Sequence, residues 1–105
     1  MESYSVRCIF LWPPRPGSAT SHVYEERITL WHAGDIDEAI SLAEAEAEEY
    51  ASDGERFLGL SQAYRLPEPL PVSGCEVFSL LRGSELSPQE YISQFFSTGS
   101  EHERA

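Results

Sequence analysis

The chain has 105 residues, with seven basic residues, all arginines, against eighteen acidic ones, so its formal net charge is −11 at pH 7. Apolar residues make up 41% of it, which is enough for a buried core and argues against wholesale disorder. The charge argues against direct binding to nucleic acid or to an anionic membrane, because both require cationic surface. The length fits one α+β domain, predicted over residues 1–99, with a frayed tail over 100–105.

No stretch of the chain approaches the ~20 apolar residues that cross a bilayer. The N-terminal residues lack the basic region of a signal peptide, so we expect a cytoplasmic protein. Cys8 and Cys75 are therefore expected to be free thiols and not a disulfide framework.

Four strands are predicted from apolar and β-branched runs bounded by turn residues. They cover residues 4–12, 23–32, 57–66 and 75–81. The first two are expected to pair as a hairpin across a proline-rich loop, and the last two form a second predicted hairpin. A helix joins the two pairs, and it can connect parallel or antiparallel neighbours, so the strand order stays open.

The helix between the pairs is the strongest local prediction. Asp35 can cap its N-terminus, and Glu38, three residues later, completes an acidic capping box. At 100° per residue the apolar side chains share one arc of the helix. They are Ile36, Ala39, Ile40, Ala43, Ala47, Tyr50 and Ala51. This pattern predicts an amphipathic helix lying on the sheet, and residues 52–54 end it.

A second helix is predicted to begin after Ser87, with Pro88 at its first position and Glu90 as the capping-box partner. Its predicted buried stripe is Tyr91, Ile92, Phe95 and Phe96, and Gly99 ends it. The order ββαββα predicts an α+β fold in which two helices pack on one face of a four-stranded, mostly antiparallel sheet.

That arrangement leaves the second face of the sheet open. Ile9 and Leu11 would lie there, together with Val23 and Trp31 or their alternating partners. A second copy packed sheet to sheet would cover such a face, so the pattern is compatible with a homodimer.

Three segments resemble a small bacterial family catalogued as domain of unknown function 4288. The first is residues 24–30 (YEERITL). The second is the start of the first helix, with DEAI at 37–40 and AE at 43–44. The third is residues 74–79 (GCEVFS). The resemblance implies a compact α+β domain of about this size. It carries no known reaction, so it assigns no catalytic residue.

The first helix and its flanks contain nine acidic residues and no basic one between positions 35 and 55. Like charges four residues apart, and acids near a helix C-terminus, both oppose helix stability. The candidate docking residues for a basic protein partner are Glu38, Glu44, Glu48 and Glu49. The alternative is that glutamate serves there only as a helix former and solubilising residue.

A carboxylate also interrupts an apolar strand face, because Glu26 alternates with Tyr24 and Ile28. A buried carboxylate must be paired or its pKa rises. One reading is a structural ion pair with Arg7, Arg65 or Arg82. The other is a small polar pocket for a ligand or a reaction, lined by Glu26, Glu76 and Arg7.

No histidine or cysteine pair has the spacing of a metal site, and no nucleophile or phosphate-binding motif is present. We therefore predict no metal, no cofactor and no catalytic residue. The leading hypothesis is a non-enzymatic interaction module that docks a basic protein, such as an immunity-like, antitoxin-like or regulatory protein. The alternatives are a homodimeric ligand-binding protein or enzyme with the Glu26 and Glu76 pocket, and an assembly subunit.

Overall fold

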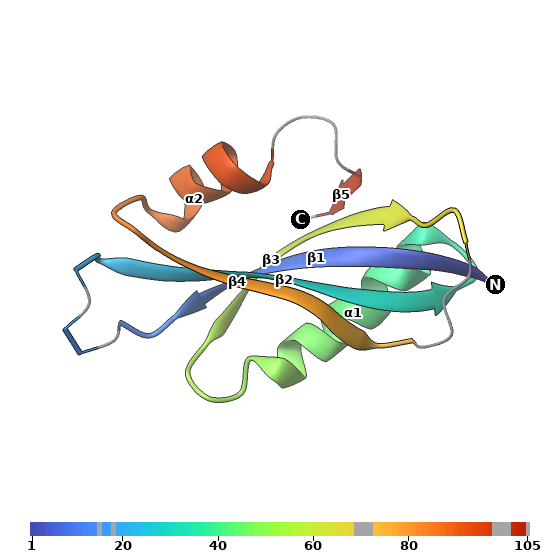
Figure 1. The fold of residues 1–105 in the computed structure, drawn as a ribbon, viewed down its shortest axis with the longest axis horizontal. Helices are drawn as coiled ribbons and strands as arrows, with labels where there is room; N and C mark the ends of the chain where they lie inside the picture. The colour runs from blue at the N-terminus through green and yellow to red at the C-terminus, as the bar shows by residue number, and fades with distance from the viewer. Residues whose placement is uncertain (15, 18, 69–72, 98–101, 105) are drawn as a thin grey trace.

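A computed structural model of the chain describes residues 1–14, 16, 17, 19–68, 73–97 and 102–104 (Figure 1). The predicted order of two strands, a helix, two strands and a helix is confirmed, as is the α+β class. In chain order the elements are β1 (Glu2–Trp12), β2 (His22–Ala33), α1 (Ile36–Tyr50), β3 (Arg56–Arg65), β4 (Cys75–Ser84), α2 (Pro88–Tyr91), a π-helix η1 (Ile92–Phe96) and β5 (His102–Arg104).

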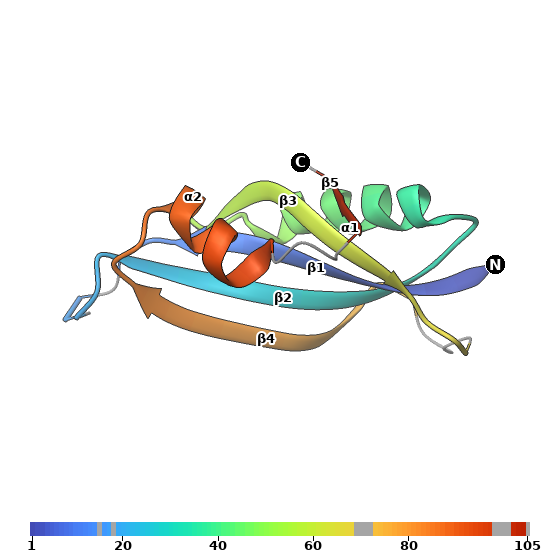
Figure 2. The ribbon, with the colours of Figure 1, turned by 90° about the horizontal axis from the view of Figure 1, so that it is seen from above.

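The strands form one sheet in the order β4-β2-β1-β3-β5, and every neighbouring pair is antiparallel. Figure 2 shows β4 at one edge, separated from β1 by β2. The first predicted hairpin is therefore present, but the second is not, since β3 and β4 lie on opposite sides of the β1–β2 pair. The sequence 67–74 contains three prolines and offers no tight turn that would fold β4 back on β3.

The C-terminal tail also differs from its prediction. Residues 102–104, expected to be frayed, form β5 and pair with residues 61–63 of β3. The predicted stop at Gly99 lies outside the described residues. Strand β3 itself is irregular where it passes Ile9, and Gly59 there has a φ of +78°, a conformation that favours glycine.

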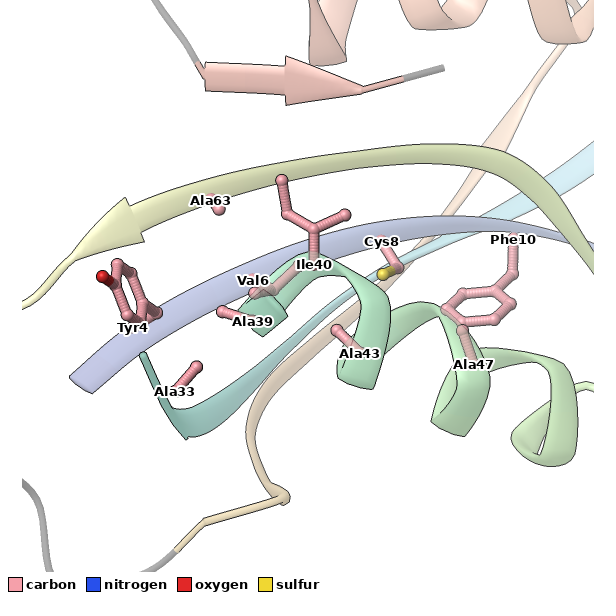
Figure 3. Close-up of a cluster of buried hydrophobic side chains, with 10 residues drawn as sticks. All are labelled: Tyr4, Val6, Cys8, Phe10, Ala33, Ala39, Ile40, Ala43, Ala47 and Ala63. Carbon is pink, nitrogen blue, oxygen red and sulfur yellow. The ribbon is translucent and has the colours of Figure 1, made fainter. Parts of the chain in front are cut away.

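Helix α1 packs on one face of the sheet, as its apolar arc predicts. The Asp35 carboxylate accepts the backbone N–H of Glu38 at 2.8 Å, and the Glu38 carboxylate accepts that of Gly34 at 3.0 Å. Figure 3 shows the core beneath the helix, where alanines let the helix approach the strands closely. Its buried members are Tyr4, Val6, Cys8, Phe10, Ala33, Ala39, Ile40, Ala43, Ala47 and Ala63.

The second helix lies on the opposite face, so the prediction that both helices share one face is wrong. The predicted capping box between Ser87 and Glu90 starts α2, and the chain continues into η1. A separate core forms there from Ile9, Tyr24, Leu60, Tyr91 and Phe96, with Leu11 packed against it. Because β1 is apolar on both faces, each face needs its own cover.

The expected open face is thus occupied where Ile9 and Leu11 lie. Trp31 belongs to the other face, since it pairs with Tyr4 and packs against the core under α1. Ile9 is fully buried there, so it is not available for a sheet-to-sheet contact.

Candidate functional site

Two consecutive glutamates in the middle of β2 are buried on opposite faces of the sheet. Glu25 is paired with Phe10 and faces α1, whereas Glu26 is paired with Ile9 and faces α2 and η1. Their relative exposures are 1% and 7%. A buried carboxylate must be compensated, and the two faces do this in different ways.

Neutral donors surround Glu25. The indole Nε1 of Trp12 donates to Oε1 at 2.9 Å, the Tyr50 hydroxyl lies 3.0 and 2.9 Å from the two oxygens, and the Ser79 hydroxyl donates to Oε2. Burial, and then the bond to Glu25, raise the pKa of Tyr50 to about 12. The phenol therefore remains a donor at neutral pH.

Arg27 lies on the same face as Glu25 but is engaged by two other carboxylates. Its NH1 and NH2 lie 2.5 and 2.8 Å from the Glu46 oxygens, and its Nε donates to Glu76. The guanidinium also stacks over the Tyr50 ring, 3.8 Å from the centroid. This network ties α1, β2 and β4 together.

Cations flank Glu26 on the other face. The Tyr91 hydroxyl donates to its Oε2 at 2.7 Å, and Arg7 Nε and Arg82 NH1 each lie 3.7 Å from one of its oxygens. The predicted structural ion pair is present with these two arginines. Arg65 does not contribute, because it pairs with Glu2.

Aromatic rings hold the two arginines in place. Arg7 lies 4.1 Å from the centroid of Phe96 and donates to its backbone oxygen at 3.0 Å, and Arg82 lies 4.4 Å from the centroid of Phe95. Burial, followed by the bond to Glu26, raises the pKa of Tyr91. The cluster therefore anchors η1 to the sheet.

The predicted pocket of Glu26 and Glu76 is not formed. Glu76 is paired with Thr29 and bonded to Arg27 on the α1 face, whereas Glu26 and Arg7 lie on the other face. Two surface hollows of about 220 and 270 Å³ are lined by other residues. The first lies between Glu2 and Arg65, and the second between Leu58 and Ile92.

Two of the predicted docking glutamates have structural partners. Glu38 accepts the backbone N–H of Gly34, immediately before the N-cap of α1, and so is engaged at the start of the helix. Glu44 accepts the Ser61 hydroxyl of β3 at 2.8 Å and so leans towards the sheet. These two side chains therefore contribute less free acceptor capacity to the surface than fully exposed carboxylates would.

The other two, Glu48 and Glu49, are exposed near the C-terminal end of α1. In the described part of the chain, neither takes part in an ion pair. No basic residue lies on α1, so its outer face carries uncompensated negative charge.

Sequence reasoning missed the role of Glu25. A signal was present, because the run Glu25-Glu26-Arg27 places three charged residues in the middle of a strand, where all three are buried. The described residues contain no group of three or more histidine, cysteine or acidic side chains placed to hold a metal ion. Likewise, none of their helices has the length and apolar character needed to cross a bilayer.

No family model matches the chain, and neither a curated protein nor a solved structure matches it. The resemblance to domain of unknown function 4288 therefore stays a prediction.

Proposed function

We propose that this protein is a non-enzymatic interaction module that docks a basic protein partner on the outer face of α1. The observation that carries the proposal is the pair of exposed, unneutralised carboxylates Glu48 and Glu49 on a helix with no basic residue. Their position near the negative end of the helix dipole adds to the local potential.

The internal carboxylates support this choice by contrast. Glu25 is saturated by three intramolecular donors, and Glu26 is enclosed by two arginines and a tyrosine. Both therefore serve the fold. The negative charge that remains for a partner lies on the surface, where it steers a cationic protein and accepts its arginines or lysines.

The test uses charge reversals with a matched control. Glu48→Arg and Glu49→Arg each change the net charge from −11 to −9, and so does Glu68→Arg at an exposed position outside α1. Tagged wild-type and variant proteins are used to capture partners from the native host at low and high salt. We expect a basic partner that is held by the wild type and the Glu68→Arg variant, and lost by both α1 variants and at high salt.

The α1 variants are expected to keep the thermal stability of the wild type, because exposed substitutions change it little. Equal capture by all four proteins would contradict docking on α1. If only the tagged protein is recovered, the proposal that it binds a basic partner is contradicted.

A further inference from the structure

Strand β4 is an unprotected edge of the sheet. In the described part of the chain it pairs only with β2, on one side. Three of its apolar side chains are among the most exposed large hydrophobic residues: Val77 at 53%, Phe78 at 50% and Leu81 at 43%. Natural edge strands are usually short or protected by charges, so a ten-residue edge with this apolar exposure indicates an interface.

The sequence of this edge has a centre of symmetry at Ser79. Residues 76–82 read acid, two apolar residues, serine, two apolar residues and base (EVFSLLR). When two such strands run antiparallel with Ser79 opposite Ser79, Phe78 faces Leu80 and Val77 faces Leu81. Each exposed apolar side chain is then opposite another apolar one.

The charges at the ends of this segment are compatible with the same arrangement. Glu76 and Arg82 retain 40% and 37% exposure of their side chains. Antiparallel pairing brings the acidic end of one strand to the basic end of the other, twice per pair, whereas parallel pairing would place like charges together. Glu76 lies on the α1 face beside Arg27, and Arg82 lies on the α2 face beside Glu26, so these ends meet in sequence without forming cross-strand ion pairs. The edge is therefore complementary to itself in its apolar pattern.

The faces of the strand agree with this pairing. Phe78 and Leu80 are opposite Ile28 and Glu26 of β2, so they share the α2 face. Leu81 is opposite Glu25 and lies on the α1 face. The register shift between β2 and β4 occurs at Val77, which leaves Phe78 to Ser84 as a regular ladder.

We propose that a second copy of this chain pairs with β4 in antiparallel orientation, with the two-fold axis at Ser79, to form one continuous sheet across the dimer. The proposal goes beyond the docking function of α1 and uses different residues. It gives the predicted homodimer a route through the sheet edge, in place of the sheet face that α2 and η1 cover.

The first experiment measures the dimer dissociation constant by sedimentation equilibrium over about 1 μM to 1 mM protein. Salt of about 0.3 M screens the repulsion between two chains of charge −11. We expect the wild type to dimerise, and Leu81→Glu to raise the constant about 30-fold or more. Leu42→Glu is the matched control, because Leu42 is a similarly exposed leucine, at 39%, on α1.

The second experiment tests the register. Val77→Arg and Leu81→Glu are each expected to be monomeric alone, because a charge then opposes an apolar residue at two places. In an equimolar mixture, the introduced arginine of one chain opposes the introduced glutamate of the other, and the remaining Val77 and Leu81 form a native pair. We expect the mixture to form dimers.

Circular dichroism confirms that each variant is folded before it is compared. A wild type that remains monomeric at all concentrations would overturn the proposal, and so would an equal loss of dimer in the Leu42→Glu control. A mixture that stays monomeric would overturn the register centred on Ser79.

Discussion

The two faces of the sheet each contain a buried glutamate, and they stabilise it with different kinds of partner. Adjacent glutamates, Glu25 and Glu26, are both buried, yet one is held by neutral hydrogen-bond donors and the other by cations. On the α1 face, the available guanidinium, Arg27, is engaged by Glu46 and Glu76. Because the chain has few arginines, Glu25 is instead bound by the Trp12 indole and by the hydroxyls of Tyr50 and Ser79.

This difference affects how each face tolerates change. A hydroxyl can turn and accept a hydrogen bond as well as donate one, whereas a guanidinium can only donate. The Glu25 face should therefore tolerate loss of charge but not loss of the acceptor. The Glu26 face should be sensitive to loss of charge itself.

The largest effect is expected from Glu25→Ala. It removes the common acceptor of Trp12, Tyr50 and Ser79, and leaves the half-buried donors of Trp12 and Tyr50 without their partner, at a cost of about 3 kcal/mol in the free energy of unfolding. Urea denaturation followed by circular dichroism measures this change. The exposed Glu48→Ala serves as control, with a change expected within about 0.5 kcal/mol. A loss below about 1 kcal/mol for Glu25→Ala would show that water replaces the carboxylate.

The glutamine variants separate the two faces directly. We expect Glu26→Gln to lower the free energy of unfolding by about 2 kcal/mol, because Arg7 and Arg82 lose their shared counter-charge. Glu25→Gln is expected to cost about 1 kcal/mol, since the Tyr50 and Ser79 hydroxyls can accept from the new amide. Urea denaturation of both glutamine variants shows which one loses more of its free energy of unfolding. The reverse order would mean that the two arginines are stabilised mainly by their aromatic neighbours.

Alkaline pH tests the tyrosines that serve the two carboxylates. Tyr50, whose pKa burial and Glu25 raise to about 12, stays protonated in the folded protein while the unfolded chain releases its proton near 10. The unfolded state then binds fewer protons, so stability is fully present below pH 10 and falls as pH rises towards 12. Urea midpoints at several values of pH measure this slope.

Tyr50→Phe and Tyr91→Phe should each make the slope shallower, because each removes one group whose pKa is raised in the folded protein. An unchanged slope in both variants would assign the alkaline loss to other groups.

The smallest effect is expected in an experiment without mutation, which measures how fast the native thiols of Cys8 and Cys75 are modified. Burial, followed by the charge of Glu44, raises the pKa of Cys8 under α1 to about 12. We expect a thiol reagent at neutral pH to modify Cys8 at least about a thousandfold more slowly in the folded protein than in urea. Peptide mass spectrometry gives the rates for Cys8 and for the half-buried Cys75 separately. Fast modification of Cys8 would show that α1 lifts from the sheet without global unfolding.

Local chemistry made much of this fold predictable. Asp35 and Ser87 cap the two helices as expected, since a capping side chain contacts backbone only three residues away. The apolar arc of α1 is buried for the same kind of reason, because helical periodicity is a property of the segment itself.

The candidate surfaces were predicted unevenly. Glu48 and Glu49 are exposed, as a docking role requires, and Glu26 has the predicted arginine partners Arg7 and Arg82. Glu76 was placed in the wrong site, because the face that a strand residue occupies depends on register, and the register shift between β2 and β4 occurs at Val77, next to it.

The sequence by itself determined the element order, the caps and the amphipathic face of α1, all of which depend on interactions over a few residues. Tertiary structure decided the rest: β4 lies beside β2 and not β3, α2 covers the face opposite α1, and Glu25 and Glu26 are held on opposite faces. These outcomes depend on contacts between residues 19 to 89 positions apart in the chain, which local propensity does not specify.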